Sequence, residues 1–186
     1  MSQNDRISLS PVTDDQHPAL AAAKKSLGFV PNMYRAMATA PGLLESYLHG
    51  YEQFRNHSGF TPAQQEVVFL TLSRENACHY CMAAHSMLAE QMSQVPADVT
   101  AAIRNGVEIG DAQYAALHRF TKIMWASRGQ PSAEQVAEFL AAGFSERQIL
   151  DIITALAVKT LSNYTNHLFD TDVDHQFAAY RWQQDD

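Results

Sequence analysis

Apolar residues recur at intervals of three and four along most of the chain, which is the period of an amphipathic α-helix. One such stretch runs from Gly42 to about Arg55, and its apolar face consists of Leu43, Leu44, Tyr47, Leu48, Tyr51 and Phe54. Another runs from Asp111 to Arg128, with Tyr114, Leu117, Phe120, Ile123 and Met124 on one face. No stretch predicts a convincing strand, so the pattern favours an all-α protein.

Capping signals mark where these helices begin and end. Thr61 and Gln64 form a capping-box pattern with Pro62 in the first turn, and Gly28 is placed to close the first helix. The predicted helices span residues 18–27, 33–39, 42–55, 61 to about 75, 78 to before 96, 96–105, 111–128, 132–142 and 145–167. Residues 1–16 are predicted to be an irregular lead-in, and residues 1–186 a single helical domain.

A shift of 84 residues reveals a faint internal repeat. GFTPAQQ at 59–65 aligns with GFSERQI at 143–149, and Cys78 and Cys81 then align with Ser162 and Thr165. This similarity predicts a degenerate duplication of a helical unit with the chemistry kept in one half. The helices also outnumber what a chain of this length can wrap around one core, so we expect a homo-oligomer.

Composition narrows the range of partners. The chain has 186 residues, 46% of them hydrophobic, which suffices for one well-buried domain. Its net charge is −7 with 13 Lys and Arg, so nothing favours binding to nucleic acid or to an anionic membrane. The polar N-terminus does not resemble a signal peptide and no long apolar run occurs, so we expect no membrane association and a cytoplasmic location.

The only two cysteines lie in one short motif. Cys78, Cys81 and His85 follow one another at intervals of three and four, so a helix would place them on one face. If that helix begins near Cys78, its free N–H groups and positive dipole end favour a thiolate. His85 lies one turn after Cys81, where it can accept the Cys81 proton. The pattern predicts a redox-active dithiol with Cys81 as the base-assisted sulfur.

Glu66 lies twelve residues before Cys78, on the preceding predicted helix. From there its carboxylate could bind His85 and fix the tautomer of the imidazole. Residues 66–85 therefore form the predicted redox motif.

A zinc site and a pair of buried structural cysteines are two other interpretations of the motif. A zinc site would need further ligands, and the later residues Ser162, Thr165 and His167 could supply them only if the tertiary fold happened to bring them to the cysteines. The cysteines could also be buried structural residues. Asn163, Tyr164, Asn166 and His167 could face the dithiol across the repeat, but polar residues near a helix end are more often caps or solvated. We favour the redox dithiol and expect no metal and no bound cofactor.

The spacing of these four residues resembles that of a known family. Glu66, eleven residues, Cys78, two residues, Cys81, three residues and His85 resemble the signature of alkyl hydroperoxidase D-like (AhpD-like) proteins, in the carboxymuconolactone decarboxylase superfamily. VPNMYRAMATAPGLLESY at 30–47 and SNYTNHLFDTDVD at 162–174 are similar to the peroxidase-related branch, so the resemblance covers most of residues 25–182.

The resemblance implies an all-helical homo-oligomer, a trimer or hexamer, that reduces hydroperoxides. By that resemblance Cys81 is the peroxidatic cysteine and Cys78 the resolving cysteine, while Glu66 and His85 form a proton relay. An external dithiol donor, in the family a lipoyl-bearing protein, would recycle the pair.

One position departs from the family pattern. The best-studied members of the family have a histidine directly before the second cysteine, where this chain has Tyr80, with His79 one place earlier. We expect His79 to be a solvated residue at the helix start. The alternatives left open are a general thiol–disulfide oxidoreductase and a non-catalytic redox sensor or helical assembly module.

Overall fold

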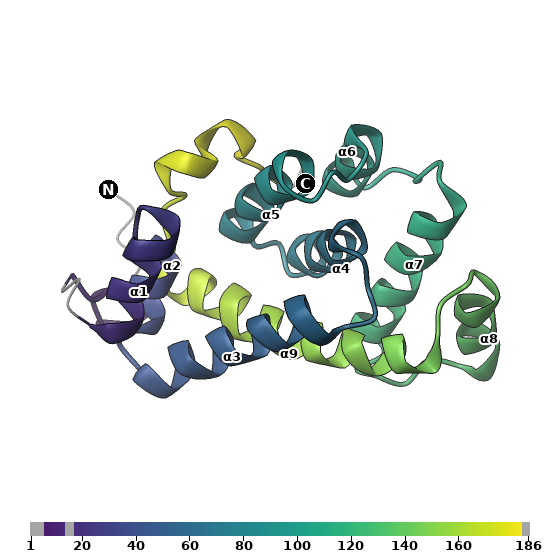
Figure 1. Ribbon diagram of the computed structural model, residues 1–186, viewed down its shortest axis with the longest axis horizontal. Coiled ribbons are helices and arrows are strands. Elements are labelled where there is room, and N and C mark those ends of the chain that lie inside the picture. The colour runs from purple at the N-terminus through teal and green to yellow at the C-terminus, as the bar shows by residue number, and fades with distance from the viewer. Residues whose placement is uncertain (1–5, 14–16, 184–186) are drawn as a thin grey trace.

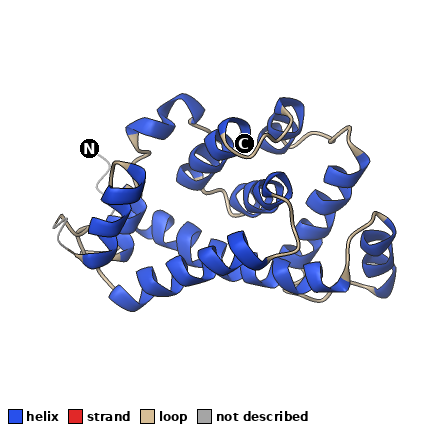
Figure 2. Cartoon of the chain, viewed as in Figure 1, coloured by secondary structure: helices blue, strands red, loops and turns tan. Residues whose placement is uncertain are grey.

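The computed structural model describes residues 6–13 and 17–183. Every regular element in these two ranges is a helix and none is a strand (Figure 2). In chain order the elements are α1 (Pro18–Leu27), α2 (Asn32–Met37), α3 (Pro41–His57), α4 (Pro62–Glu75), α5 (His79–Gln91), α6 (Ala97–Asn105), α7 (Ala112–Ala126), α8 (Ala133–Ala141), α9 (Glu146–Phe169) and the 3-10 helix η1 (His175–Tyr180). The prediction of a single all-α domain is confirmed.

Helix α4 lies at the centre of the domain. All residues from Gln65 to Ser73 are buried, so this helix is covered on every side. It packs against α5, α6, α7 and α9, and Figure 1 shows it nearly end-on with the other helices around it. Side chains on α4 are therefore shielded from water, which is unusual for a glutamate such as Glu66.

Helix α9 is the longest element, with 24 residues. It packs along α3 and also contacts α4 and α5 (Figure 1). The C-terminal part of the chain is thereby brought against the connection between α4 and α5, where both cysteines lie.

Most predicted helix boundaries agree with the structure to within a few residues. Thr61 and Ser145 both form capping boxes, with Gln64 and Gln148 as their partners. The predicted helix 33–39 is α2, Asn32–Met37, and η1 was not predicted. Of the predicted lead-in 1–16, residues 6–13 form no helix, while 1–5 and 14–16 lie outside the described residues.

The two halves of the predicted repeat start alike and then differ. α4 ends at Glu75 and the chain turns before α5, whereas α9 continues unbroken through Ser162 and Thr165. The duplication therefore stays a prediction. The break that distinguishes the halves occurs at the cysteines.

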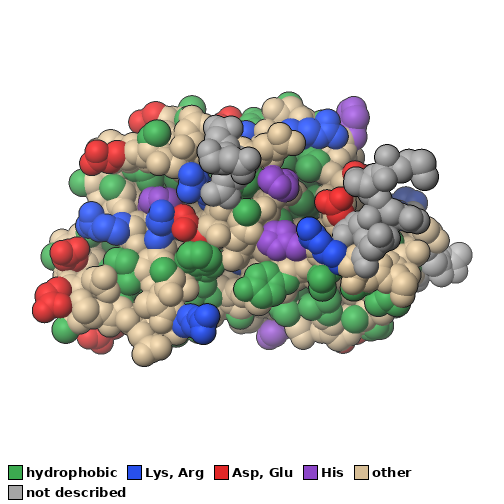
Figure 3. Space-filling view, turned by 180° about the vertical axis from the view of Figure 1, so that it is seen from behind, with side chains coloured by type: hydrophobic (Ala, Val, Ile, Leu, Met, Phe, Trp, Pro, Cys, Tyr) green, Lys and Arg blue, Asp and Glu red, His purple; other side chains and the backbone are tan. Residues whose placement is uncertain are grey.

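The surface carries scattered charge. In the view of Figure 3, Lys and Arg side chains are interspersed with Asp and Glu side chains and with apolar ones, and histidines lie near the middle of this face. None of the helices in the described part of the chain is sufficiently long and apolar to span a lipid bilayer.

Candidate redox site

A tight turn between α4 and α5 places both cysteines at the start of α5. The backbone N–H of Cys78 donates to the carbonyl of Ser73 at 2.9 Å, and that of Ala77 donates to Arg74 at 2.8 Å. These two bonds are the pattern of a Schellman motif. Ala77 adopts the left-handed conformation with φ 52°, a conformation that usually requires glycine. Cys78 is consequently the N-cap of α5 and Cys81 its third residue.

Both cysteines are buried free thiols, with exposed fractions of 1% and 2%. Burial alone would raise the pKa of the Cys81 thiol, but a hydrogen bond from Cys78 and the charges of Lys159 and His85 bring it well below its usual value. Burial raises the pKa of Cys78, and the neighbouring Cys81 raises it further. The site thus favours a thiolate on Cys81 and a thiol on Cys78, and the place of Cys81 in the first turn of α5 also favours its thiolate.

The predicted contact between Glu66 and His85 is present. The Nδ1 atom of His85 lies 2.8 Å from a carboxylate oxygen of Glu66, and both side chains are buried. The other Glu66 oxygen accepts a hydrogen bond from the guanidinium of Arg55. Burial would raise the pKa of Glu66, but His85 and Arg55 together hold it below its usual value. A carboxylate can only accept, so Nδ1 of His85 donates and Nε2 remains free to take up a proton.

Helix α9 contributes a row of buried polar side chains to the site. Lys159, Asn163 and Asn166 are spaced by four and three residues and lie on one face of α9, with exposed fractions of 1%, 0% and 4%. The side-chain nitrogen of Asn166 lies 3.4 Å from the Cys81 sulfur and 3.7 Å from the Cys78 sulfur. An amide donor at this position stabilises negative charge on sulfur.

Asn163 supports the turn that carries Cys78. Its side-chain oxygen accepts a hydrogen bond of 2.8 Å from Asn76, the residue that caps α4. Asn76 in turn accepts one of 2.7 Å from the indole of Trp125 on α7. Two helices, α7 and α9, thus hold the α4–α5 turn in place.

An apolar cavity of about 410 Å³ reaches Cys81 and His85. Its wall consists of Ser26, Leu27, Phe29, Pro31, Met33, Tyr34, Tyr47, Tyr51, Tyr80, Cys81, Ala84, His85, Met87, Leu88, Met92 and Phe177. Aromatic and aliphatic side chains make up most of this wall, and Cys81 and His85 are the reactive groups in it. Such a cavity suits an apolar ligand that meets a few polar groups at one end.

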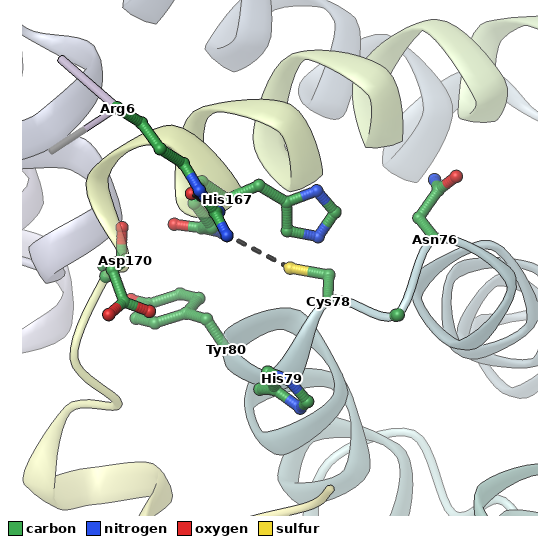
Figure 4. A pocket seen from close by; sticks show the side chains of 10 residues that line it. Arg6, Asn76, Cys78, His79, Tyr80, His167 and Asp170 are labelled. Carbon is green, nitrogen blue, oxygen red and sulfur yellow. Dashed lines mark hydrogen bonds between the residues drawn. The ribbon is translucent and has the colours of Figure 1, made fainter. Parts of the chain in front are cut away.

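A second pocket, of about 330 Å³, reaches Cys78 instead. Arg6, Asn76, His79, His167 and Asp170 line it, so its character is polar (Figure 4). The dashed line that ends on the Cys78 sulfur in Figure 4 marks its contact with the side chain of Asn166. The two sulfurs therefore face two different environments.

Tyr80, in the place of the family histidine, links the site to η1. Its buried hydroxyl donates to Asp174, the residue that caps η1, and its ring packs edge-on against Phe177 at 6.1 Å. Burial raises the pKa of Tyr80 well above its usual value, so the hydroxyl keeps its proton. His79 is exposed and lies 3.1 Å from the carbonyl of Trp182 through Nδ1.

The groups considered as further zinc ligands do not join the cysteines in such a site. The hydroxyls of Ser162 and Thr165 bond to carbonyls of their own helix, at 3.1 Å from Val158 and 2.7 Å from Leu161. Within the described residues, no group of three or more His, Cys, Asp or Glu side chains is arranged to hold a metal ion.

Comparison with known proteins agrees with this architecture. The chain is similar in fold to a peroxidase-related protein from Silicibacter sp. TM1040, with a TM-score of 0.75 and 20% identity over 93% of this chain and 92% of that one. It is also similar to the peroxidase-related protein with an alkylhydroperoxidase AhpD core from Ralstonia eutropha JMP134, with a TM-score of 0.77 and 19% identity over 89% and 88%.

Residues 41–122 match the model of the carboxymuconolactone decarboxylase family, and this region contains Glu66, Cys78, Cys81 and His85. The chain has the fold of these AhpD-like proteins. No curated protein matches the sequence. The chain is also similar in fold to a cysteine-to-alanine variant of the debrominase Bmp8 in complex with 2,3,4-tribromopyrrole, with a TM-score of 0.75 and 17% identity over 94% of this chain and 95% of that one.

Sequence reasoning missed three members of this site. Asn166 was expected to be a cap or solvated, yet it is buried against both sulfurs. Lys159 and Arg55 were not considered as members of the site. One signal was available for Lys159 and Asn166, because they continue the buried stripe of Ile152 and Ala155 along α9.

Proposed function

We propose that this chain reduces organic hydroperoxides, with Cys81 as the attacking sulfur and Cys78 as the resolving sulfur. The proposal rests mainly on one observation: Cys81 and His85 share an apolar cavity, while Cys78 faces a separate polar pocket. The match of residues 41–122 to the family model and the similarity in fold to two peroxidase-related proteins support an enzyme of this general type.

The lining of the cavity favours an organic substrate. Hydrogen peroxide is small and polar, so it would gain little from a wall of aromatic and aliphatic side chains. A hydroperoxide with an aryl or alkyl tail would bury that tail against Tyr34, Tyr47 and Met87. The peroxide group would then lie at the end of the cavity formed by Cys81 and His85.

The chemistry proceeds in three balanced steps. The Cys81 thiolate attacks the terminal oxygen of the hydroperoxide, an S–O bond forms, the O–O bond breaks, and the alkoxide takes one proton to leave as an alcohol. The Cys78 sulfur then attacks the sulfenic sulfur of Cys81, and water leaves with the thiol proton of Cys78. A dithiol donor finally reduces the disulfide with two electrons and two protons.

His85 and Glu66 act in this scheme as a proton relay. Nε2 of His85 accepts the proton of the Cys81 thiol and returns it to the departing alkoxide. Burial and the charge of Lys159 lower the pKa of His85, while Glu66 opposes that shift. The imidazolium is thus a ready proton donor. Glu66 orients the ring through Nδ1, and Arg55 keeps Glu66 ionised.

The polar pocket at Cys78 suits the second half of the cycle. A donor thiolate approaching through it would attack Cys78 and release Cys81 as the better leaving group, because the Cys81 thiolate is the more stable one. A lipoyl-bearing protein as donor and a cytoplasmic location stay predictions.

A second candidate is reductive dehalogenation of an aromatic substrate. The aromatic wall of the cavity, with Tyr34, Tyr47 and Tyr51, could stack against a halogenated ring. In this reaction the Cys81 thiolate removes the halogen as a sulfenyl halide, the ring takes one proton, and Cys78 displaces halide to form the same disulfide. The similarity in fold to the debrominase variant in complex with 2,3,4-tribromopyrrole supports dehalogenation as a candidate reaction.

The test is turnover of cumene hydroperoxide with reduced lipoamide as donor, with the thiol content of both cysteines followed by mass spectrometry. We expect turnover and an intramolecular disulfide. Cys81→Ser should abolish turnover, whereas Cys78→Ser should trap a sulfenic acid on Cys81 that dimedone labels. Glu66→Gln should leave disulfide formation intact but slower.

Other outcomes select the alternatives. Peroxide consumption by Cys81→Ser would exclude the catalytic assignment. A disulfide that forms once without turnover would indicate a redox sensor, and reduction of protein disulfides without peroxide turnover a thiol–disulfide oxidoreductase. Release of bromide from 2,3,4-tribromopyrrole, measured in parallel, would select dehalogenation.

We also propose a homo-oligomer, trimeric or hexameric. α9 exposes an apolar row on the side opposite the site, with Leu150, Ile153, Tyr164 and Leu168 exposed by 64%, 49%, 55% and 45%. A second copy of the chain would cover such a row. Light scattering of Ile153→Glu against the unchanged protein tests this, since one charge on the row should reduce the oligomer mass.

A further inference from the structure

We propose that Lys159 is the counter-ion of the Cys81 thiolate and that its positive charge decides which of the two cysteines ionises. This inference rests on the proposed function, in which Cys81 is the attacking sulfur. The sequence motif lies on α4 and α5, and the proposal adds to it a charged residue from α9.

Lys159 is buried, and no carboxylate of the described residues pairs with it. Its exposed fraction is 1%, and no Asp or Glu among the described residues lies within ion-pair distance of its ammonium group. Its Nζ atom lies over the ring of Phe69, 5.5 Å from the centroid. A buried ammonium group needs an anion to compensate its lost hydration, and a cation–π contact supplies only part of that.

The charges of the buried cluster support the same conclusion. Arg55 and Glu66 form an ion pair, and His85 binds the remaining oxygen of Glu66. Lys159 is then the cation left over among these groups, and the Cys81 thiolate is the anion that would compensate its charge. A neutral Cys81 would leave one net positive charge in a place that water does not reach.

Lys159 distinguishes between the two sulfurs. Burial raises the pKa of both thiols; at Cys81 the hydrogen bond from Cys78 and the charge of Lys159 bring it down, whereas at Cys78 the charge of Lys159 does not offset burial and the neighbouring Cys81. Asn166, two turns further along the same face of α9, is also nearer to Cys81 than to Cys78. α9 therefore presents a cation and an amide donor to the same sulfur.

The other titratable groups around Cys81 do not provide an equivalent cation. Tyr47, Tyr51 and Tyr80 lie in the same environment, and burial raises the pKa of each, so they remain neutral. Burial lowers the pKa of His167, which lines the polar pocket at Cys78, and it lowers that of His85 as well.

The pairing also links Lys159 to the redox state of the site. When Cys81 joins Cys78 in a disulfide the negative charge disappears, and the ammonium group loses its counter-ion. The ion pair thus stabilises the reduced form relative to the disulfide. Removing the lysine charge should shift the equilibrium with a dithiol such as dithiothreitol toward the protein disulfide.

The experiment measures ionisation of Cys81 without any peroxide. The reduced protein is alkylated with iodoacetamide between pH 5 and 10, and fragment-ion mass spectrometry separates modification of Cys81 from that of Cys78. The midpoint is the pH at which alkylation of a cysteine reaches half its maximal rate. In Lys159→Met, which roughly keeps the length of the side chain, we expect the midpoint for Cys81 to rise by at least about one pH unit. We also expect the disulfide equilibrium to shift about tenfold toward the oxidised form.

Controls separate charge from packing. Lys159→Arg should retain the midpoint within a few tenths of a unit, and Lys122→Met, at a partly exposed lysine on α7, should not move it. If Lys159→Met fails to fold, Lys159→Gln removes the charge and keeps a donor. An unchanged Cys81 midpoint in a folded charge-removing variant would overturn the proposal. Absence of peroxidase activity would not bear on this result, because alkylation requires no substrate.

Discussion

The side-chain nitrogen of Asn166 lies 3.4 Å from the sulfur of Cys81, although the two residues are 85 positions apart in the chain. The contact joins the end of α9 to the start of α5. Through this contact a residue near the C-terminus stabilises negative charge on the Cys81 sulfur.

Replacing this amide with a carboxylate should impair Cys81. Asn166→Asp keeps the size of the side chain but removes the donor and adds an acceptor near the sulfur. A hydrogen bond to a charged group contributes about 1.5–3 kcal/mol, so we expect the reaction of Cys81 with cumene hydroperoxide to slow by at least about tenfold. Stopped-flow kinetics of the reduced protein would measure the rate of this reaction. Asn56→Asp, on the exposed surface of α3, is the matched control. A rate within twofold of the unchanged protein would contradict a role for Asn166.

Filling the apolar cavity should affect large substrates selectively. Ala84 lines the cavity next to His85 and is 8% exposed. In Ala84→Leu the larger side chain would occupy space needed by an aryl tail, so kcat/KM for cumene hydroperoxide should fall by about tenfold, as loss of a few buried carbon contacts predicts. The kcat/KM for hydrogen peroxide should change much less. Ala101→Leu on the exposed side of α6 is the control. Equal losses for both substrates would mean that the cavity does not bind the tail.

The left-handed turn at Ala77 should be relieved by glycine. Ala77 has φ 52° at the end of α4, where its Cβ atom makes the conformation unfavourable. We expect Ala77→Gly to raise the free energy of unfolding by about 0.5–1 kcal/mol. Urea denaturation would measure this. Ala101→Gly, within α6, should show the opposite sign, because glycine weakens a helix interior. A destabilised Ala77→Gly protein would show that the methyl group of Ala77 is needed for packing.

His118 should contribute to acid sensitivity. Burial, then the charges of Lys122 and Arg74, lowers its pKa to about 4 in the folded protein, and its Nδ1 atom lies 2.8 Å from the hydroxyl of Thr71. Between about pH 6.5 and pH 4 the unfolded chain binds a proton that the folded chain does not, so stability falls as pH falls through this window.

The variant His118→Gln measures that contribution. The unchanged protein should lose about 2 kcal/mol more than His118→Gln between pH 7 and pH 4, after allowance for partial solvent screening. His85, whose pKa is also lowered, adds a loss of the same sign in both proteins. His49→Gln, on the exposed surface of α3, should behave like the unchanged protein. Identical pH profiles for all three proteins would exclude His118 as a source of acid sensitivity.

The sequence by itself determined the helices and the core of the motif. Capping boxes at Thr61 and Ser145 and apolar faces with a helical period are local signals, and the structure agrees with them. The spacing of Cys78, Cys81 and His85 is also local, because three residues on one helix take their relative positions from the helix alone. The contact between Glu66 and His85 was expected from the sequence and is present.

Only the tertiary structure decided what surrounds the dithiol. Lys159 and Asn166 reach the cysteines because α9 packs across α4 and α5, and no local rule predicts which face of one helix meets another. The same holds for the two cavities, whose walls combine side chains from distant segments. Polar residues near a helix end are usually solvated, so Asn166 was misjudged from its sequence context. Burial of α9 against the cysteines changes its environment, and with it the ionisation of both sulfurs.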